Sequence, residues 1–261
     1  MQEFKVDQLS VKVFGTRAEM GRQAALVVCK QITALLNKQD FVNIIFAAAP
    51  SQNEFLAALV ERKDIAWQRI NAFHMDEYIG LPGNAPQSFG AFLMEKVFGH
   101  LPFNAVNYIG GNADNPKAEC TRYTSLLAEY PPDIVCMGIG ENGHIAFNDP
   151  HVADFNDPLA VKVVELDTEC RRQQVNDGCF SSFDRVPTHA LTLTIPALMA
   201  GKHIHCMVPG KNKARAVYNT LNGEINEQCP ASVLRHHPQA ILFLDEDSSF
   251  KLNLDDQKIK S

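Results

Sequence analysis

The stretch "GIGENGHIAFNDP" (138–150) places an imidazole, an amide and carboxylates within a few residues of one another. It follows an apolar run that predicts a buried strand, and its glycines let the backbone turn sharply beside a ligand. His144 can donate or accept a proton near neutral pH, and Asp149 or Glu141 can fix its tautomer. The stretch therefore predicts an acid–base site, although a loop histidine with a capping aspartate has the same residue types.

Two further loops carry charged groups directly after predicted strands. "HMDEYIGLPGNAPQSFGAFL" begins with the adjacent carboxylates Asp76 and Glu77, one of which would serve as a base unless both only favour a turn. "MVPGKNKARAV" sets cations at the start of a predicted helix, where they oppose the helix dipole. That placement indicates that Lys211 or Lys213 faces an anion, the alternative being a solvated lysine.

The first six residues of 138–150 also fit G-x-G-x-x-G, the pattern of a dinucleotide-binding turn. Such a turn needs a strand before it and a helix directly after it. The segment after Gly143 reads "HIAFNDPHVADFNDP", and its two Asp-Pro pairs disfavour a helix. Because no helix N-terminus would face a pyrophosphate, the sequence predicts no dinucleotide cofactor.

Strand-like and helix-like runs alternate along the chain. Strands are predicted at 42–48, 69–75, 132–140, 160–167, 202–208 and 239–247, and a strand passing into a short helix at 189–201. Helices are predicted at 52–63, 118–130 and 211–224. Apolar strands between helices indicate an α/β chain, with a mostly parallel central sheet covered on both faces in a three-layer sandwich. Ligands bind beyond the carboxyl ends of such strands, so the charged loops are expected to meet there.

Composition narrows the class of protein. The chain has 261 residues, a net charge of −6 and no basic block, so we expect one domain over 1–261 and no nucleic-acid partner. Its seven scattered cysteines contain no C-x-x-C, which predicts reduced thiols in the cytoplasm and no zinc site. The first residues lack the apolar segment of a signal peptide, and no run approaches the roughly 20 apolar residues of a membrane helix.

Six blocks in order along most of the chain resemble the glucosamine-6-phosphate deaminase/isomerase family. They are "MDEYIGLP", "GGNADNPKAECTRY", "GIGENGHIAFNDP", "VPTHALTLTIPALMAGK", "MVPGKNKARAV" and "CPASVLRHHP". The resemblance implies a Rossmann-like α/β fold. It also implies an aldose–ketose isomerisation of an amino sugar with loss of ammonia, with no cofactor.

The resemblance also implies residue roles. Asp76 would move a proton between C2 and C1 of the sugar, and His144 would act in opening the ring. Asn142 and Asp149 would stand beside this histidine, with the aspartate one methylene shorter than the glutamate usual in the family. Lys213 would hold the substrate phosphate. Further substrate contacts are expected at Ser51, Glu77, Gly143, Arg171 and Arg172.

The phosphate-binding parts of the family pattern are altered in this sequence. The loop after the first core strand reads "AAAPSQNEF", with alanines for glycines and a proline that has no N–H. Ser51 and Glu54 in it fit an S-x-x-E capping box, in which the glutamate occupies donors that a phosphate would use. "CRRQQVNDGCF" has Asp177 in a region where the family has a second arginine. We therefore expect an amino sugar that is unphosphorylated, phosphorylated elsewhere, or held by Arg171 or Arg172.

Two other functions fit the same fold. A 6-phosphogluconolactonase shares a G-x-G-x-[DN]-G-H-like loop, but that group lacks the MDEY block present here. A non-catalytic sugar sensor usually carries a DNA-binding segment before the fold, whereas this chain reaches the fold within about 40 residues. The presence of Asp76 and His144 favours an enzyme, and a homo-oligomer is left open.

Overall fold

An eight-stranded sheet forms the centre of the structure, a computed structural model that describes residues 1–83 and 85–253. The strands lie in the order β1-β2-β11-β10-β7-β3-β4-β6, and every neighbouring pair is parallel except β1 and β2. Their bounds are β1 Gln2–Val6, β2 Leu9–Phe14, β3 Val42–Phe46, β4 Ile70–His74, β6 Ala105–Asn107, β7 Ile134–Met137, β10 His203–Val208 and β11 Ala240–Asp245. The mostly parallel central sheet is therefore confirmed.

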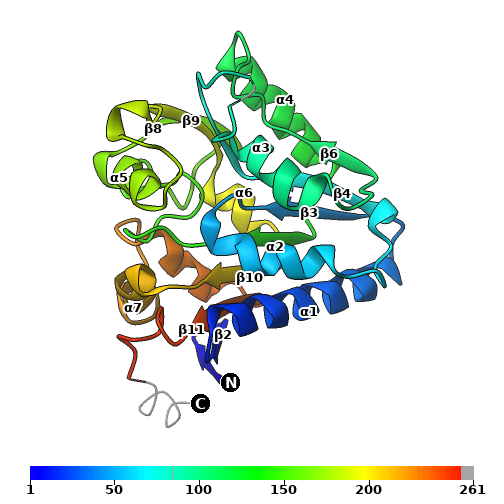
Figure 1. The fold of residues 1–261 in the computed structure, drawn as a ribbon, viewed down its shortest axis with the longest axis vertical. Helices are drawn as coiled ribbons and strands as arrows, with labels where there is room; N and C mark the ends of the chain where they lie inside the picture. The colour runs from blue at the N-terminus through cyan, green and yellow to red at the C-terminus, as the bar shows by residue number, and fades with distance from the viewer. Residues whose placement is uncertain (84, 254–261) are drawn as a thin grey trace.

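Helices cover both faces of this sheet, and each face buries its own apolar cluster (Figure 1). One face carries α1 Arg17–Leu36, α2 Asn53–Val60, α3 Phe89–Leu93 and the π-helical turn η3 Met94–Phe98. The other carries α4 Pro116–Glu129, α6 Ile195–Met199 and α7 Ala214–Asn222. The 3-10 turns are η1 Pro50–Gln52, η2 Trp67–Arg69, η4 Phe183–Arg185, η5 Lys211–Lys213 and η6 Pro230–His236. The three-layer sandwich is confirmed as well.

A second, antiparallel sheet is built from β5 Asp76–Tyr78, β9 His189–Leu193 and β8 Val161–Glu165. In Figure 1 it lies at the upper left with α5 Thr168–Asn176, which follows β8. The expectation that 160–167 and 189–193 join the parallel sheet was wrong. β8 buries Val161 and Val164 and leaves its other three residues partly or fully exposed, which suits a sheet with one solvated face.

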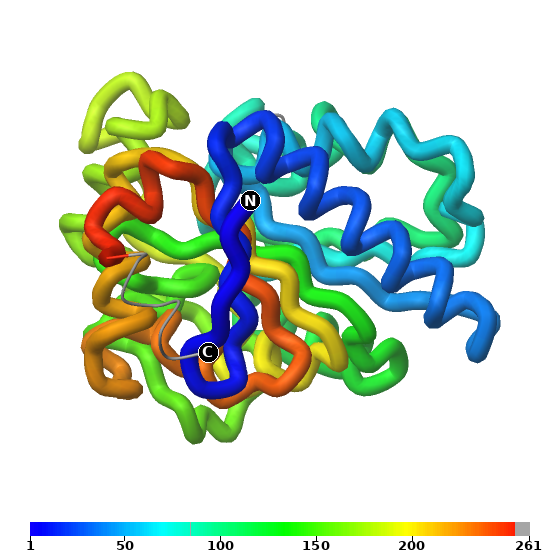
Figure 2. Tube along the Cα trace, turned by 90° about the horizontal axis from the view of Figure 1, so that it is seen from below, coloured from blue at the N-terminus to red at the C-terminus, as the bar shows by residue number. Residues whose placement is uncertain are grey.

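The first 36 residues belong to the fold, although no element was predicted for them. β1 and β2 form an antiparallel hairpin, β2 pairs with β11, and the hairpin lies in front in Figure 2. α1 follows directly, and the hydroxyl of Thr16 caps it by accepting the N–H of Glu19 at 3.1 Å. The prediction of one domain over 1–261 also includes residue 84 and 254–261, which lie outside the described residues.

Candidate active site

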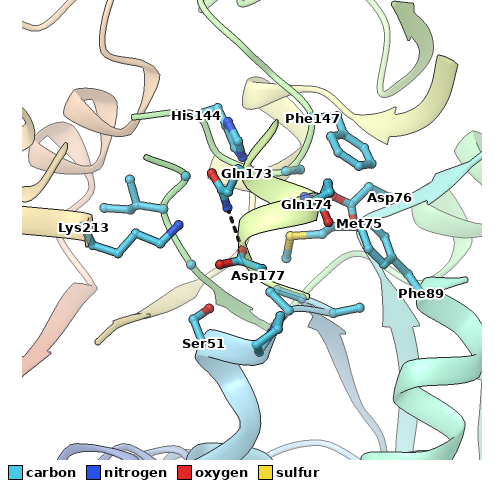
Figure 3. A pocket seen from close by; sticks show the side chains of 18 of the residues that line it. Ser51, Met75, Asp76, Phe89, His144, Phe147, Gln173, Gln174, Asp177 and Lys213 are labelled. Atoms are coloured by element: carbon cyan, nitrogen blue, oxygen red, sulfur yellow. Dashed lines mark hydrogen bonds between the residues drawn. The ribbon is translucent and has the colours of Figure 1, made fainter. Parts of the chain in front are cut away.

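Four neighbouring strands of the parallel sheet deliver side chains to a single cavity. Ser51 follows β3, Asp76 follows β4, His144 follows β7 and Lys213 follows β10. Figure 3 shows Lys213 and Ser51 on one side of this cavity and Asp76 on the other. The loops therefore meet beyond the carboxyl ends of the strands, as the alternation of strands and helices predicted.

The imidazole of His144 is held by a buried carboxylate. Its Nδ1 lies 2.8 Å from Oδ1 of Asp149, which is completely buried. Asn142 donates from Nδ2 to the same oxygen at 2.9 Å and accepts the N–H of His144 at 3.1 Å. Burial raises the pKa of Asp149, but His144 and the amide of Asn142 outweigh it and hold that pKa below its usual value. Glu141, the other candidate partner, instead accepts the side-chain N–H of Asn212 at 2.8 Å.

Two glycines allow the loop to wrap around the imidazole. A Cβ on Gly140 would overlap the ring atoms of His144, so only glycine leaves room for the ring in this position. Gly143 has φ of +90°, and a Cβ there would lie 2.8 Å from Sγ of Cys229. Gly143 does not line the cavity, so its placement supports a role in the turn rather than the expected substrate contact. Residues 138–160 contain no helix, which confirms that a dinucleotide turn lacks its required context.

Asp76 opens directly on the cavity. Its side chain is 7% exposed, and in the described part of the chain its carboxylate forms no hydrogen bond or ion pair. Burial, followed by the negative charge of Glu77, raises the pKa of Asp76 well above its usual value. A carboxylate with a raised pKa is a better proton acceptor once it is ionised.

Glu77 points away from the cavity, contrary to the expected substrate contact. Its carboxylate accepts three backbone N–H groups at 2.8–3.0 Å, those of Tyr78, Phe89 and Gly90. Burial raises the pKa of Glu77, and these three hydrogen bonds oppose that shift. The adjacent carboxylates therefore have different surroundings, because one fastens the start of α3 and the other faces the cavity.

Lys213, and not Lys211, faces the cavity. Lys213 is 5% exposed, and burial lowers the pKa of its ammonium group, against the opposing charges of Asp177 and Glu141. Lys211 is exposed, and its ammonium lies 5.0 Å from the ring centroid of Phe250.

The structure does not bring Arg171 or Arg172 to the cavity. The guanidinium of Arg171 lies over the ring of Phe183 at 4.0 Å and donates to the carbonyls of Phe183 and Val186. Arg172 is exposed. These placements correct the expectation that either arginine contacts the substrate, because the first is committed to η4 and the second faces solvent.

Gln173 and Gln174 of α5 line the cavity instead, with Asp177, which directly follows the helix (Figure 3). Gln173 accepts the N–H of Glu141 at 2.9 Å and donates to Oδ2 of Asp177 at 3.3 Å. Neither glutamine was predicted from the sequence. With Cys170, the three residues follow the i, i+3, i+4, i+7 spacing of one helix face, which is the signal that the sequence offered.

The loop after β3 differs from the predicted capping box. Pro50 begins the turn η1, so α2 starts only at Asn53 and has no side-chain cap. Glu54 instead accepts the Nε–H of Arg17 at 2.7 Å, a stronger, charge-assisted bond. Arg17 also donates to the carbonyl of Pro50 at 2.8 Å and lines the cavity, which the sequence analysis did not anticipate. Ser51 lines the cavity as expected.

Thr192 of β9 contacts both segments that carry the candidate acid–base groups. This fully buried residue pairs with Asp76 in the register of β5 and β9. Its hydroxyl accepts the N–H of Phe147 at 3.1 Å, in the loop that carries His144. The distance between the candidate base and the imidazole therefore depends on this threonine.

One group of potential metal ligands is found among residues 1–83 and 85–253. His144, Asp149 and Cys170 have ligand atoms within 4.8 Å of one another. The 2.8 Å between Nδ1 of His144 and Oδ1 of Asp149 is shorter than the separation of two ligands that each lie about 2.0 Å from one zinc ion. The geometry therefore favours acid–base chemistry at this position.

Comparison with known proteins places this site in a family. Residues 15–243 match the family described as Glucosamine-6-phosphate isomerases/6-phosphogluconolactonase. The chain belongs to this family. The resemblance on which the sequence analysis relied is thereby confirmed, and the chain is an enzyme of the isomerase/lactonase family.

Individual family members agree with this assignment. A glucosamine-6-phosphate deaminase of Bacillus cereus is 39% identical over 191 residues, 73% of this chain and 71% of the relative. One from Listeria monocytogenes is 36% identical over 208 residues, 80% and 87% of the two chains. The solved structure of a monomeric glucosamine-6-phosphate deaminase superposes with a TM-score of 0.84 at 30% identity, covering 92% of this chain and 98% of that one.

The lactonase branch of the family shares the fold. The 6-phosphogluconolactonase of Thermotoga maritima superposes with a TM-score of 0.74 at 19% identity, covering 91% of this chain and 99% of that one. Among the described residues, no helix combines the length and apolar character that crossing a bilayer requires.

Proposed function

We propose that this enzyme is an amino-sugar isomerase and deaminase. It would convert glucosamine 6-phosphate or a related amino sugar to the corresponding ketose with release of ammonia. The observation that supports this best is that Asp76 and His144 open on one cavity, with His144 backed by the buried Asp149. The deaminase names of relatives 36–39% identical to this chain support the same reaction.

The proposed chemistry divides the proton transfers between two groups. His144 accepts the proton of the anomeric hydroxyl and returns a proton to the ring oxygen, which opens the ring. Asp76 then takes the proton from C2 of the open-chain aldehyde, which gives an enolamine, and delivers it to C1. O1 gains a proton and the amino nitrogen loses one, which leaves a hydroxymethyl group at C1 and an imine at C2. The imine adds water and loses ammonia, so the products are the ketose and ammonia.

The other site residues have supporting roles in this proposal. Asn142 and Asp149 position His144, and Ser51 and Lys213 bind the end of the sugar farthest from Asp76.

We further propose that the chain works as a single domain in the cytoplasm, with the sugar rather than a nucleic acid as its partner. All seven cysteines are free thiols, which supports a reducing compartment. Assembly into a homo-oligomer is compatible with these roles.

Ammonia release tests the proposal directly. Glucosamine and glucosamine 6-phosphate are supplied in parallel to the wild type, Asp76→Asn and the control Asp40→Asn, whose side chain is 98% exposed. Loss of the base should lower kcat by about 10²–10⁴-fold, while the control keeps wild-type activity. Hydrolysis of 6-phosphogluconolactone without ammonia release would place the enzyme among the lactonases. Calorimetric binding of either sugar without turnover would indicate a sensor.

A further inference from the structure

The end of the cavity beside Lys213 carries opposite charges on two elements. Lys213 belongs to η5, and Asp177 follows the last turn of α5. Both line the cavity, yet they form no ion pair within 4.0 Å among the described residues. Their charges interact, because Asp177 is the largest of the influences that raise the pKa of Lys213 against burial. A ligand group bound between them would therefore meet a hydrogen-bond donor on one side and an acceptor on the other.

Asp177 is held in this position by neighbouring groups. Its Oδ2 accepts a hydrogen bond from Gln173 at 3.3 Å, and its backbone N–H donates to the carbonyl of Gln173 at 2.8 Å. Gln173 is itself anchored to the His144 loop through the N–H of Glu141. A carboxylate at a helix C-terminus opposes the helix dipole, so this location does not serve helix stability.

The remaining groups at this end provide little additional positive charge. Arg17 also lines the cavity, but its guanidinium is paired with Glu54 at 2.7 Å and bonded to the carbonyl of Pro50. Pro50 has no N–H, and the N–H groups of Ala47 and Gln52 are bonded to carbonyls of the protein. The ammonium group that lines this end of the cavity, that of Lys213, is therefore opposed by the carboxylate of Asp177.

We infer that this end of the cavity binds a neutral hydroxyl of an unphosphorylated hexosamine, and that Asp177 is the residue that excludes a phosphate. This inference rests on the proposed amino-sugar deaminase function. A hydroxyl accepts a hydrogen bond from Lys213 and donates one to Asp177, which matches its one donor and two acceptor sites. A phosphate ester carries a charge of about −1.5 to −2 and mainly accepts, so Asp177 repels it.

Substrate preference in charge-matched variants tests the inference. We compare kcat/KM for glucosamine and glucosamine 6-phosphate in the wild type, Asp177→Asn and Asp184→Asn, an exposed residue of η4 outside the cavity. The wild type should favour glucosamine, and Asp177→Asn should shift the ratio toward the 6-phosphate by about tenfold or more. Asp184→Asn should leave it unchanged. Thermal unfolding checks each fold, and Asp177→Ser replaces the asparagine variant if that variant does not fold.

A second measurement separates this inference from the proposed function. Calorimetry with inorganic phosphate should detect tighter binding to Asp177→Asn than to the wild type, whether or not either sugar is turned over. Ammonia from neither sugar would overturn the proposed function, and the phosphate titration would still decide the role of Asp177. Wild-type preference for the 6-phosphate, or equal phosphate binding by both proteins, would overturn the inference.

Discussion

Nδ1 of His144 lies 2.8 Å from Oδ1 of Asp149 although this carboxylate is one methylene shorter than the glutamate expected from the family resemblance. The loop folds back on itself through a bridge between Ile145 and Asn148, which brings Asp149 beside the ring. Asn142 then fixes the same oxygen at 2.9 Å. The shorter aspartate therefore still contacts the imidazole.

Replacing Asp149 with asparagine should uncouple His144 from its proton partner. The variant keeps the volume of the side chain but removes the charge that fixes the tautomer, so kcat should fall by about 10²–10⁴-fold. Steady-state ammonia release measures the effect, with circular dichroism as the check on folding. A kcat within twofold of wild type would show that Asp149 does not position the imidazole for catalysis.

Gly140→Ala should displace the imidazole. The added Cβ would overlap the ring of His144, so either the ring or the loop must move, and a displacement of about 1 Å can lower activity by about 10²-fold. Gly83→Ala is the matched control, because its nearest atom, Nδ2 of Asn112, lies 3.9 Å away. Equal activity of the two variants would contradict a close fit between Gly140 and His144.

Activity should depend on the ionisation of Asp76. Because burial and the charge of Glu77 raise the pKa of Asp76, kcat/KM should rise with pH as this carboxyl group loses its proton, and fall as pH drops through the raised pKa. Glu77→Gln removes the like charge, so the acid limb of the profile should move to lower pH. An unmoved limb in a variant with a wild-type melting temperature would assign the titration to another group.

Sugar binding should disturb α5. The cavity has a volume of about 120 Å³, below the roughly 300–1,000 Å³ of most ligand pockets, and α5 contributes part of its wall. A hexosamine therefore needs these side chains or the helix to shift. Saturating glucosamine should change amide hydrogen exchange in residues 168–177 and leave α1 unchanged. Identical exchange with and without sugar would mean that the cavity accepts its ligand without rearrangement.

The site was predicted correctly from the sequence where reactive residue types directly follow an apolar, strand-like run. Glycines, a histidine and carboxylates after apolar runs were enough to bring Asp76 and His144 to one sheet edge. The small sheet was missed because β5 was predicted as a charged loop and β8 and β9 as strands of the parallel sheet. Only long-range pairing separates β8 and β9 from that sheet. Arg17 was missed for a related reason, since its bond to Pro50 spans 33 residues and requires α1 to pack on α2.

Because Thr192 pairs with Asp76 in the small sheet and accepts the N–H of Phe147 in the loop after β7, the candidate base and the imidazole are linked through one buried residue of β9. The distance between Asp76 and His144 thus depends on how β9 packs against the loop after β7. A substitution at Thr192 can therefore change which sugar fits between these two side chains without altering either of them.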